Sequence, residues 1–551
     1  QAFYRLDRQI GKNTGRSLEI RKLMVGSESK ATKKIKNLLE EADVRPEEGR
    51  IELKKKIKQV KDKKGVIAVL KAAQEKLGIN FINKFWINAL LSNPKTHAIN
   101  MTSNTIMALI RPMEQYMGGV LTRDKSARIE AVATAAGIIK YFQDALQMSR
   151  VAYKQSDSIL DKKNFKVDLP ENTFNKKANI IERKVIEAPT RFLNAEDEMF
   201  KQLNYRAKVY GMAVAEGLRK GLSKKKTHFT SDGRKYSELD KFIEDKFDDA
   251  FNPDFSGKNK VALEYAQENT FTKALGQGTL GKTVQSAVNQ VPILRQIMPF
   301  VRTPVNIARA VWDRSPLGIF RKKFREELFS PDKSIRASAV GKQTMGGALF
   351  ASSLVLAWNG MITGGVPKDK NLRRQKFDAG WRPYSFKVGD KYISYERLDP
   401  FGMFFGLVAD YAAIANEVTA EERQELADAN MMALLNQMEI GDYSEIAAGG
   451  VLATAKNLSS KTYIKSLTDF ISAFASGDPR EVKRYGLTKA GSFVPNIVKG
   501  IANDPLYRET RTLTDTLKSR VGLYGDIDPS FNVLGEARSK GQSWWESFLL
   551  P

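Results

Sequence analysis

The chain has 551 residues and a formal net charge of +26, from 89 basic and 63 acidic side chains. It contains no cysteine, which excludes disulfides, thiolate nucleophiles and cysteine-ligated metal sites, and its two histidines, His97 and His228, are too far apart in sequence to suggest an imidazole site. The basic excess favours a polyanionic partner, either nucleic acid or an anionic membrane surface, without choosing between them.

Residues 1–64 are predicted to form a basic N-terminal arm. Within this arm, residues 54–64 read KKKIKQVKDKK, with seven lysines in eleven residues. One interpretation is a solvated amphipathic helix whose apolar side consists of Ile51, Leu53, Ile57 and Val60. The other is an arm that follows phosphates or lipid headgroups. Its candidate contacts are Lys54, Lys55, Lys56 and Lys58.

Helical spacing of apolar residues predicts a first helical domain over 65–260. A helix breaks at residues 93–94, an Asn-Pro pair, and then restarts, because proline disfavours the helical conformation of the residue before it. Helical spacing continues over 126–153 and 181–222, with a polar stretch between them that we expect to be a loop. Residues 223–260 are rich in Lys, Asp and Gly and are expected to be exposed.

A second helical domain is predicted over 261–420, and its first notable motif is GQGTLGKT. This motif matches the P-loop pattern, in which Lys282 would reach the terminal phosphate and Thr283 would hold magnesium. A P-loop follows a buried strand, whereas the preceding residues YAQENTFTKAL read as a polar helix. The match is therefore interpreted as a chance one, and no cofactor or metal ion is expected at Gly276, Gly281, Lys282 and Thr283.

An aromatic and basic stretch, WDRSPLGIFRKKFREELF, occupies residues 312–329. It can be read as a surface that touches phosphates or lipid headgroups, or as a solvated helix face that covers Phe320, Phe324 and Leu328. Its candidate phosphate or headgroup contacts are Arg321, Lys322, Lys323 and Arg325.

The run TMGGALFASSLVLAWNGMITGG, residues 344–365, carries no charge. Spanning a hydrocarbon core takes about 20 mostly apolar residues, and small residues permit close helix packing in membranes. The candidate membrane-segment residues are Met345, Leu349, Leu354, Leu356 and Trp358. The alternative is a buried core helix of a soluble state, and such a helix could expose Ser353 on its polar side.

One place reads clearly as a β-hairpin, near 384–396, where alternating residues flank the turn pair Gly389-Asp390. An apolar helix is expected after the Asp-Pro-Phe-Gly sequence at 399–402, and a helical C-terminal region is expected over 421–551. The predicted fold class is therefore mainly α: an elongated multi-helix protein with one small hairpin.

Four further segments occur in order along the chain: NPKTHAINMTSN (93–104), VPILRQIMPFVRTPVNIARAVWDRSPLGIF (291–320), WRPYSFKVGDKYISYERLDPFGMFFGLVADYAAI (381–414) and NDPLYRETRTLTDTLKSRVGLYGDIDPSFNVLGEA (503–537). Together they resemble the helical region of large phage polyvalent and internal virion proteins, a family that includes DNA-ejection proteins of short-tailed bacteriophages. The resemblance covers roughly residues 80–540, and none of its segments is catalytic.

The resemblance implies a protein stored in the virion interior and released through the tail to help form a conduit for DNA in the host periplasm and inner membrane. The implied partners are other internal virion proteins, the portal region, further copies of the chain, DNA bound without sequence preference, and the host inner membrane. Some members carry a transglycosylase domain, but no stretch resembling its ES…GLMQ motif occurs here, so we expect no enzyme within these residues. The alternative is an injected nucleic-acid-binding effector without channel function.

Overall fold

The computed structural model describes residues 79–155, 157–161, 186–223, 227–229, 235–276, 300–367, 370–417, 479–501, 504–531 and 535–539, together with residues 282, 285, 286, 289 and 453. The described chain is mainly helical, as predicted. The basic arm, including Lys54, Lys55, Lys56 and Lys58, lies outside the described residues, as does much of the predicted C-terminal region.

The helices of the first half are α5 (Ile79–Leu91), α6 (Pro94–Leu121), α7 (Lys125–Lys140), α8 (Phe142–Gln155), α9 (Ala188–Arg219), α10 (Glu238–Asp248) and α11 (Lys260–Asn269). The next group consists of α13 (Arg302–Asp313), the 3-10 helix η3 (Pro316–Phe320), α14 (Lys322–Leu328), α15 (Lys333–Trp358), α16 (Lys370–Asp378) and α17 (Phe401–Glu417). The C-terminal helices are α22 (Pro479–Gly491), α23 (Asn496–Ile501) and α24 (Leu513–Arg520).

Side-chain caps set the starts of the helices that matter most for function. The side chain of Asn93 accepts a hydrogen bond from the Lys95 backbone N–H at 2.9 Å, which caps α6 at the predicted Asn-Pro break. Asp124 caps α7 and Asp332 caps α15 in the same way, each accepting from two backbone N–H groups. Arg123, with φ of 55°, closes the short loop that joins α6 to α7.

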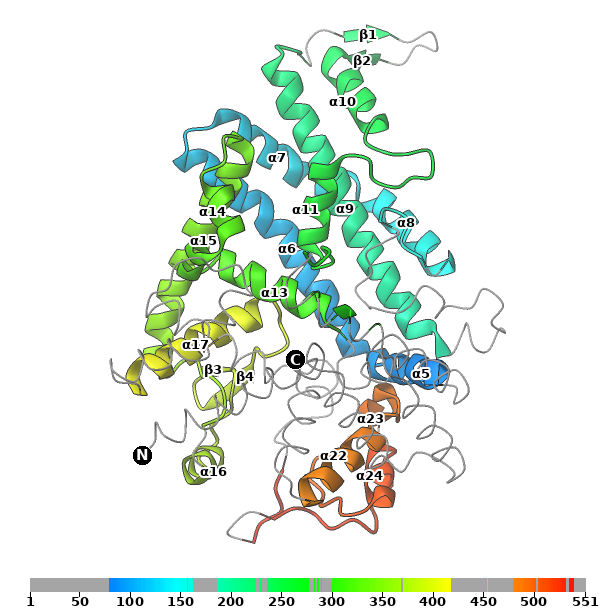
Figure 1. Ribbon diagram of the computed structural model, residues 1–551, viewed down its shortest axis with the longest axis vertical. Coiled ribbons are helices and arrows are strands. Elements are labelled where there is room, and N and C mark those ends of the chain that lie inside the picture. Colours follow the sequence, from blue (N-terminus) through cyan, green and yellow to red (C-terminus); the bar gives the residue numbers. More distant parts are fainter. Residues whose placement is uncertain are drawn as a thin grey trace, which may run out of the picture.

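Helix α9 runs through the helical body and packs against α5, α6, α7, α8, α10 and α11 (Figure 1). Helix α9 is so deeply buried that even polar side chains are covered: Lys201, Gln202 and Asn204 are each at most 1% exposed. Asn204 donates to the Phe200 carbonyl at 2.7 Å and accepts from Asn269 at 2.6 Å. The buried amide of Asn204 is therefore hydrogen-bonded inside the protein, as most buried polar groups are.

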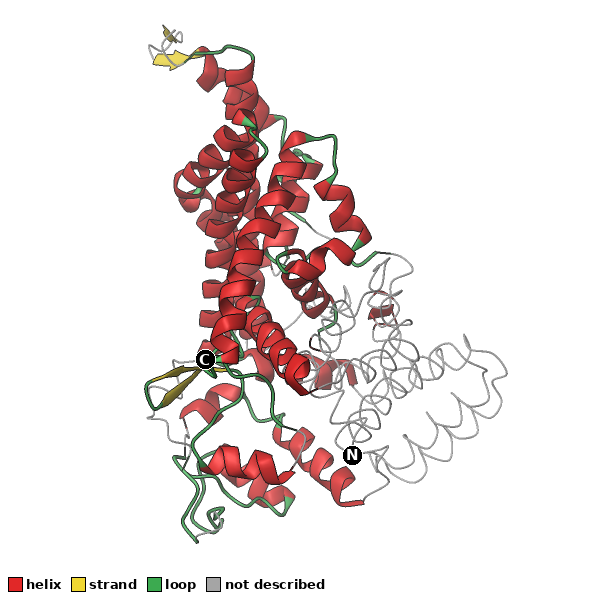
Figure 2. Ribbon diagram, turned by 90° about the vertical axis from the view of Figure 1, so that its left-hand side faces the viewer, coloured by secondary structure: helices red, strands yellow, loops and turns green. Residues whose placement is uncertain are grey.

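The predicted hairpin is confirmed, with β3 (Ser385–Val388) paired antiparallel to β4 (Lys391–Ser394). Gly389 has φ of 60°, a conformation that glycine adopts without steric cost at the first position of a two-residue turn. The structure adds a second strand pair that the sequence analysis missed, β1 (Thr227–Phe229) with β2 (Lys235–Ser237). Figure 2 shows the two pairs at separate places on a body that is otherwise helical.

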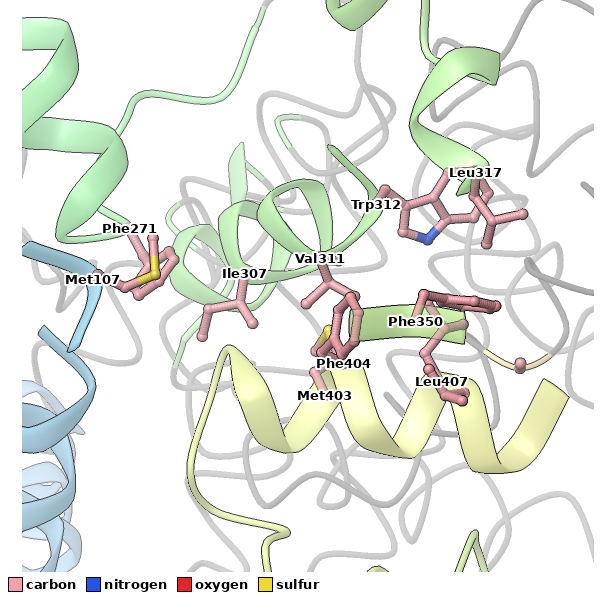
Figure 3. Close-up of a cluster of buried hydrophobic side chains, with 13 residues drawn as sticks. Met107, Phe271, Ile307, Val311, Trp312, Leu317, Phe350, Met403, Phe404 and Leu407 are labelled. Carbon is pink, nitrogen blue, oxygen red and sulfur yellow. The ribbon is translucent and has the colours of Figure 1, made fainter. Parts of the chain in front are cut away.

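The predicted domain boundary at residue 260 does not separate two packing units. Helix α11 packs against α9, and α15 packs against α6, so elements from both sides of the boundary interlock. Their main shared core is drawn in Figure 3. Its buried members are Met107, Phe271, Ile307, Ala308, Val311, Trp312, Leu317, Phe350, Met403, Phe404, Leu407, Val408 and Ala453.

Helices α6 and α15 cross at glycine residues with their backbones in direct contact. A Cβ on Gly118 would lie 1.6 Å from the Ala337 carbonyl oxygen, and a Cβ on Gly341 would lie 1.7 Å from the Glu114 carbonyl oxygen. No residue other than glycine fits at either position without separating the helices. Such small-residue contacts let two helices approach closely over a long shared edge.

Gly341→Ala is expected to destabilise the protein by about 2 kcal/mol or more, because the added methyl group must push two backbones apart. The matched control is Gly347→Ala in the same helix, where an added Cβ meets nothing within 4 Å. That control should stabilise the protein by about 0.5–1 kcal/mol through helix propensity alone. Denaturant unfolding measures both, and a stabilising Gly341→Ala would contradict the observed crossing.

Candidate functional surface

The charge-free run 344–365 is not one continuous helix. Helix α15 ends at Trp358, and the chain then turns so that Ile362 pairs with Phe386 of the hairpin. The helical part of the run, from residue 344 to Trp358, is about 22 Å long at 1.5 Å per residue. The predicted membrane segment was therefore too long. Residues 359–365 are not helical, because this part of the chain contacts the hairpin instead.

The polarity of α15 is the reverse of the expected one. Ser353, which a soluble core helix could have exposed, is only 2% exposed, whereas Leu356 and Trp358 are 41% and 53% exposed. The other candidate membrane residues divide between the two sides: Leu349 is exposed, Met345 is partly buried, and Leu354 packs against the main core. From residue 338 to the helix end the single charged residue, Lys342, is buried and pairs with Glu327 at 3.4 Å.

Helix α6 shows the same reversal over a longer stretch, and the sequence analysis missed it. From residue 98 to residue 121 its two charged residues, Arg111 and Glu114, are 5% and 1% exposed. Its exposed positions recur every three or four residues and carry no charge. They are Ala98, Met101, Thr102, Thr105, Leu109, Met113, Tyr116, Met117, Val120 and Leu121.

The charges of α6 are neutralised in the protein interior. Arg314, which follows α13, donates from Nε to Glu114 Oε1 at 2.6 Å and from Nη2 to Oε2 at 2.9 Å. Arg111 donates from Nε to Asn269 at 2.9 Å and from Nη2 to Glu268 at 3.1 Å. These charge-assisted bonds hold α6 against α11 and against the end of α13.

A second buried ion pair joins α7 to α9. Lys208 pairs with Glu130 and also donates to Gln115 at 3.2 Å, while Ser334 of α15 donates to Glu130 at 2.9 Å. Burial acts to raise the pKa of Glu130, but the Lys208 charge and the hydrogen bonds to the carboxylate outweigh it and hold the pKa below its ordinary value. The carboxylate therefore remains ionised at neutral pH although it is buried.

We name the uncharged outer sides of α6 and α15 the apolar band. In α6 the band covers about 24 residues, which is about 36 Å of helix. Contiguous exposed apolar surface on a folded protein marks contact with a membrane or with another protein. Its most exposed large side chains are Leu109, Met113, Tyr116, Val120, Leu121, Val355, Leu356 and Trp358.

Within the described ranges, no single helix combines the length and the mean apolarity needed to cross a bilayer. For α6 and α15, the reversed polarity explains why the mean apolarity of the helix is too low. One side of each helix carries the interior charges and small polar residues, so the average over the whole helix is low although the outer side of its central stretch is uncharged.

The basic residues predicted near η3 and α14 have different environments. Arg321 is 5% exposed and pairs with Asp313, so its guanidinium faces the protein rather than a surface ligand. Lys323 is partly exposed and lies 3.2 Å from Glu264. Lys322 is exposed and Arg325 is partly exposed. Of the four predicted phosphate or headgroup contacts in this stretch, Lys322 is therefore the one that is fully exposed.

The P-loop-like motif follows helix rather than strand. Helix α11 ends at Asn269, and an irregular segment leads from there to Gly276, whereas a P-loop requires a buried strand at this point. Lys282 is described, and its Nζ lies 3.4 Å from Gln285. Gly281 and Thr283 lie outside the described residues. Among the residues that are described, no group of three or more potential ligand side chains could hold a metal ion.

No known protein family, curated protein or solved structure matches the chain.

Glu114→Ala should destabilise the fold by about 3–5 kcal/mol, because it leaves the buried Arg314 without its carboxylate. The control is Lys220→Ala, which removes one partner of the surface pair Lys220–Glu216 and should change the stability by less than about 1 kcal/mol. Denaturant unfolding measures both variants. Equal effects in the two would contradict an energetic role for the interior charges.

Proposed function

We propose that the chain is an internal virion protein of a short-tailed phage, stored in the capsid and delivered into the host envelope to help form a conduit for genome entry. Its partners would be other internal virion proteins, the portal region, further copies of itself, DNA bound without sequence preference, and the host inner membrane after ejection. The proposal includes no catalytic activity for these residues.

The observation that carries the proposal is the apolar band. Two adjacent helices turn every charge of their central stretches inward and present uncharged side chains outward. This is the arrangement expected where the surroundings are hydrocarbon, because ionised side chains there face the protein interior and pair with one another. The sequence features fit the same function: a net charge of +26 suits storage beside DNA, and a chain without cysteine forms no disulfides in any compartment.

The location of the protein tests this proposal. The expected result is that purified, DNA-filled particles of the phage contain many copies of the chain, arranged around the portal. Quantitative mass spectrometry of the particles measures the copy number, and asymmetric electron-microscopy reconstruction shows the position. Absence of the chain from such particles would remove the proposal.

A pair of surface substitutions tests the apolar band. Met113→Lys together with Val355→Lys should leave the stability within about 0.5 kcal/mol per site, because both side chains are more than half exposed. Genome entry should nevertheless fail, since a lysine at the centre of a membrane costs about 2.5–3.5 kcal/mol on the translocon scale. Particle assembly and DNA entry into host cells are measured in parallel.

The matched control is Val261→Lys, an equally exposed apolar residue on α11, outside the band. It should allow normal entry. Normal entry with the band variant, or failure with the control alone, would contradict the assignment of the band to membrane contact.

The net charge favours a second candidate, an injected effector that binds nucleic acid without forming a channel. Both candidates predict DNA binding that is nonspecific and steep in salt, with log K falling by about 0.9 per phosphate contact for each unit of log salt. Filter binding of unrelated duplexes over a salt series measures this slope. A sequence-selective interaction that is insensitive to salt would exclude both candidates, and the location in the particle separates them.

A further inference from the structure

The end of α15, the hairpin and the approach to α17 form one tightly bonded corner. The Lys387 N–H donates to the Met361 carbonyl at 2.8 Å, and Ile362 forms an isolated antiparallel bridge with Phe386, so the chain after α15 is bonded to β3. Asp410 of α17 accepts from the Gly365 N–H at 2.8 Å and from the Tyr384 hydroxyl at 3.1 Å. Helix α16 leads into β3 within a few residues. Figure 1 shows α16 and the hairpin toward one end of the molecule and α10 toward the other.

This corner carries six exposed cations. Within the described residues none of the six forms an ion pair, in contrast to surface cations elsewhere, such as Lys220 and Lys518. The same stretch carries four carboxylates, of which Asp378 and Asp390 are exposed and Glu396 and Asp399 are partly exposed, so the positive charge remains in excess. The six cations are Arg374, Lys376, Arg382, Lys387, Lys391 and Arg397.

Two of these cations are held against aromatic rings. The Lys376 ammonium lies 5.4 Å from the centre of the Trp381 ring, and the Arg382 guanidinium lies 5.8 Å from that of Phe377. Cation–π contacts of this kind hold the charged groups in position. Because the two side chains are exposed, an anion can still reach their charges.

One cation of the corner, Arg397, also interacts with the start of α6. Lys95, in its first turn, lies close enough to Arg397 for the two like charges to interact. Burial, and secondarily the charge of Arg397, lowers the pKa of Lys95 to about 8. A bound anion would relieve this repulsion, so the apolar band of α6 starts at a point where positive charge is in excess.

Large apolar side chains are exposed among these cations. Trp358, Met361, Val388 and Ile393 are between 47% and 59% exposed. A nucleic acid would neutralise the cations but leave these side chains in water. A phospholipid surface satisfies both groups, because its phosphates pair with the cations and its acyl region accepts the apolar side chains.

We propose that this corner, which we name the cationic corner, binds anionic phospholipid headgroups and anchors one end of the apolar band at the membrane surface. The inference deepens the proposed function and rests on its membrane step. It names the lipid chemistry, the residues that recognise it and the end of the molecule that meets the headgroups. Phosphates lie at Arg374, Lys376, Lys387 and Lys391, while Trp358 and Met361 enter the outer acyl region.

The test uses the full chain with vesicles of phosphatidylcholine alone and of phosphatidylcholine mixed equally with phosphatidylglycerol. The chain should prefer the anionic vesicles. Arg374→Gln with Lys391→Gln should weaken binding to them by roughly 30-fold, from about five-fold for each cation at a membrane surface. The charge-matched control, Lys241→Gln with Lys258→Gln, changes exposed lysines outside the corner and should bind within about two-fold of the parent. Co-flotation measures binding, and thermal unfolding checks that both variants fold.

A second arm separates lipid from nucleic acid. Trp358→Ser should weaken vesicle binding and leave duplex DNA binding unchanged. The inference is overturned by equal affinity for both vesicle types, by equal losses in the corner and control variants, or by a Trp358→Ser chain that binds anionic vesicles as the parent does. Vesicle binding is independent of location, so a chain that shows these effects but is absent from particles would keep this inference and reject the ejection function.

Discussion

The direct backbone contact between α6 and α15 is the constraint on which the rest of the structure depends. Gly118 and Gly341 allow the two helices to touch where any side chain would collide with a carbonyl oxygen. Because the crossing fixes their rotation, Glu114 faces Arg314 and Gln115 faces Ser334. The outer sides of both helices then carry exposed apolar side chains, among them Leu109 on α6 and Val355 on α15.

The inward charges of the central helices follow from this rotation. Lys208, Glu130, Arg111 and Glu114 are buried, and each has a charged partner at hydrogen-bonding distance. Buried pairs of this kind contribute little net stability compared with apolar packing, but they strongly disfavour any arrangement that separates the partners. The network therefore specifies one register of α6 against α7, α9 and α15, and it keeps the exposed side of α6 free of charge.

The apolar band and the cationic corner make one physical picture of how the protein could lie at a membrane. The band presents uncharged side chains along α6 and α15, and the corner, which follows the end of α15, carries six exposed cations that form no ion pair with the described residues. A membrane has a matching arrangement, with an apolar hydrocarbon layer inside and anionic headgroups at its surface. An interior of neutralised charges beneath an apolar exterior is consistent with a chain that passes from storage beside DNA to contact with lipid.

Much of the local structure could be predicted from the sequence. The helix restart at Asn93-Pro94, the hairpin around Gly389 and the helix after Pro400 were all expected, because caps, turns and periodicity act over a few neighbouring residues. The charge-free run of 344–365 was also visible. Its division into a helix and a strand-like segment was not, because it depends on pairing between Ile362 and Phe386.

The sequence by itself determined the helical class, the basic excess, the absence of cysteine and the helix starts at Pro94 and Phe401. Only the tertiary structure decided which side of each helix faces inward. Periodicity identifies two sides but assigns the apolar one to the core by default, and α6 and α15 reverse that assignment. The reason is that Arg111, Glu114 and Lys342 have their neutralising partners on segments far away in the chain, and those partners come together only when the helices pack.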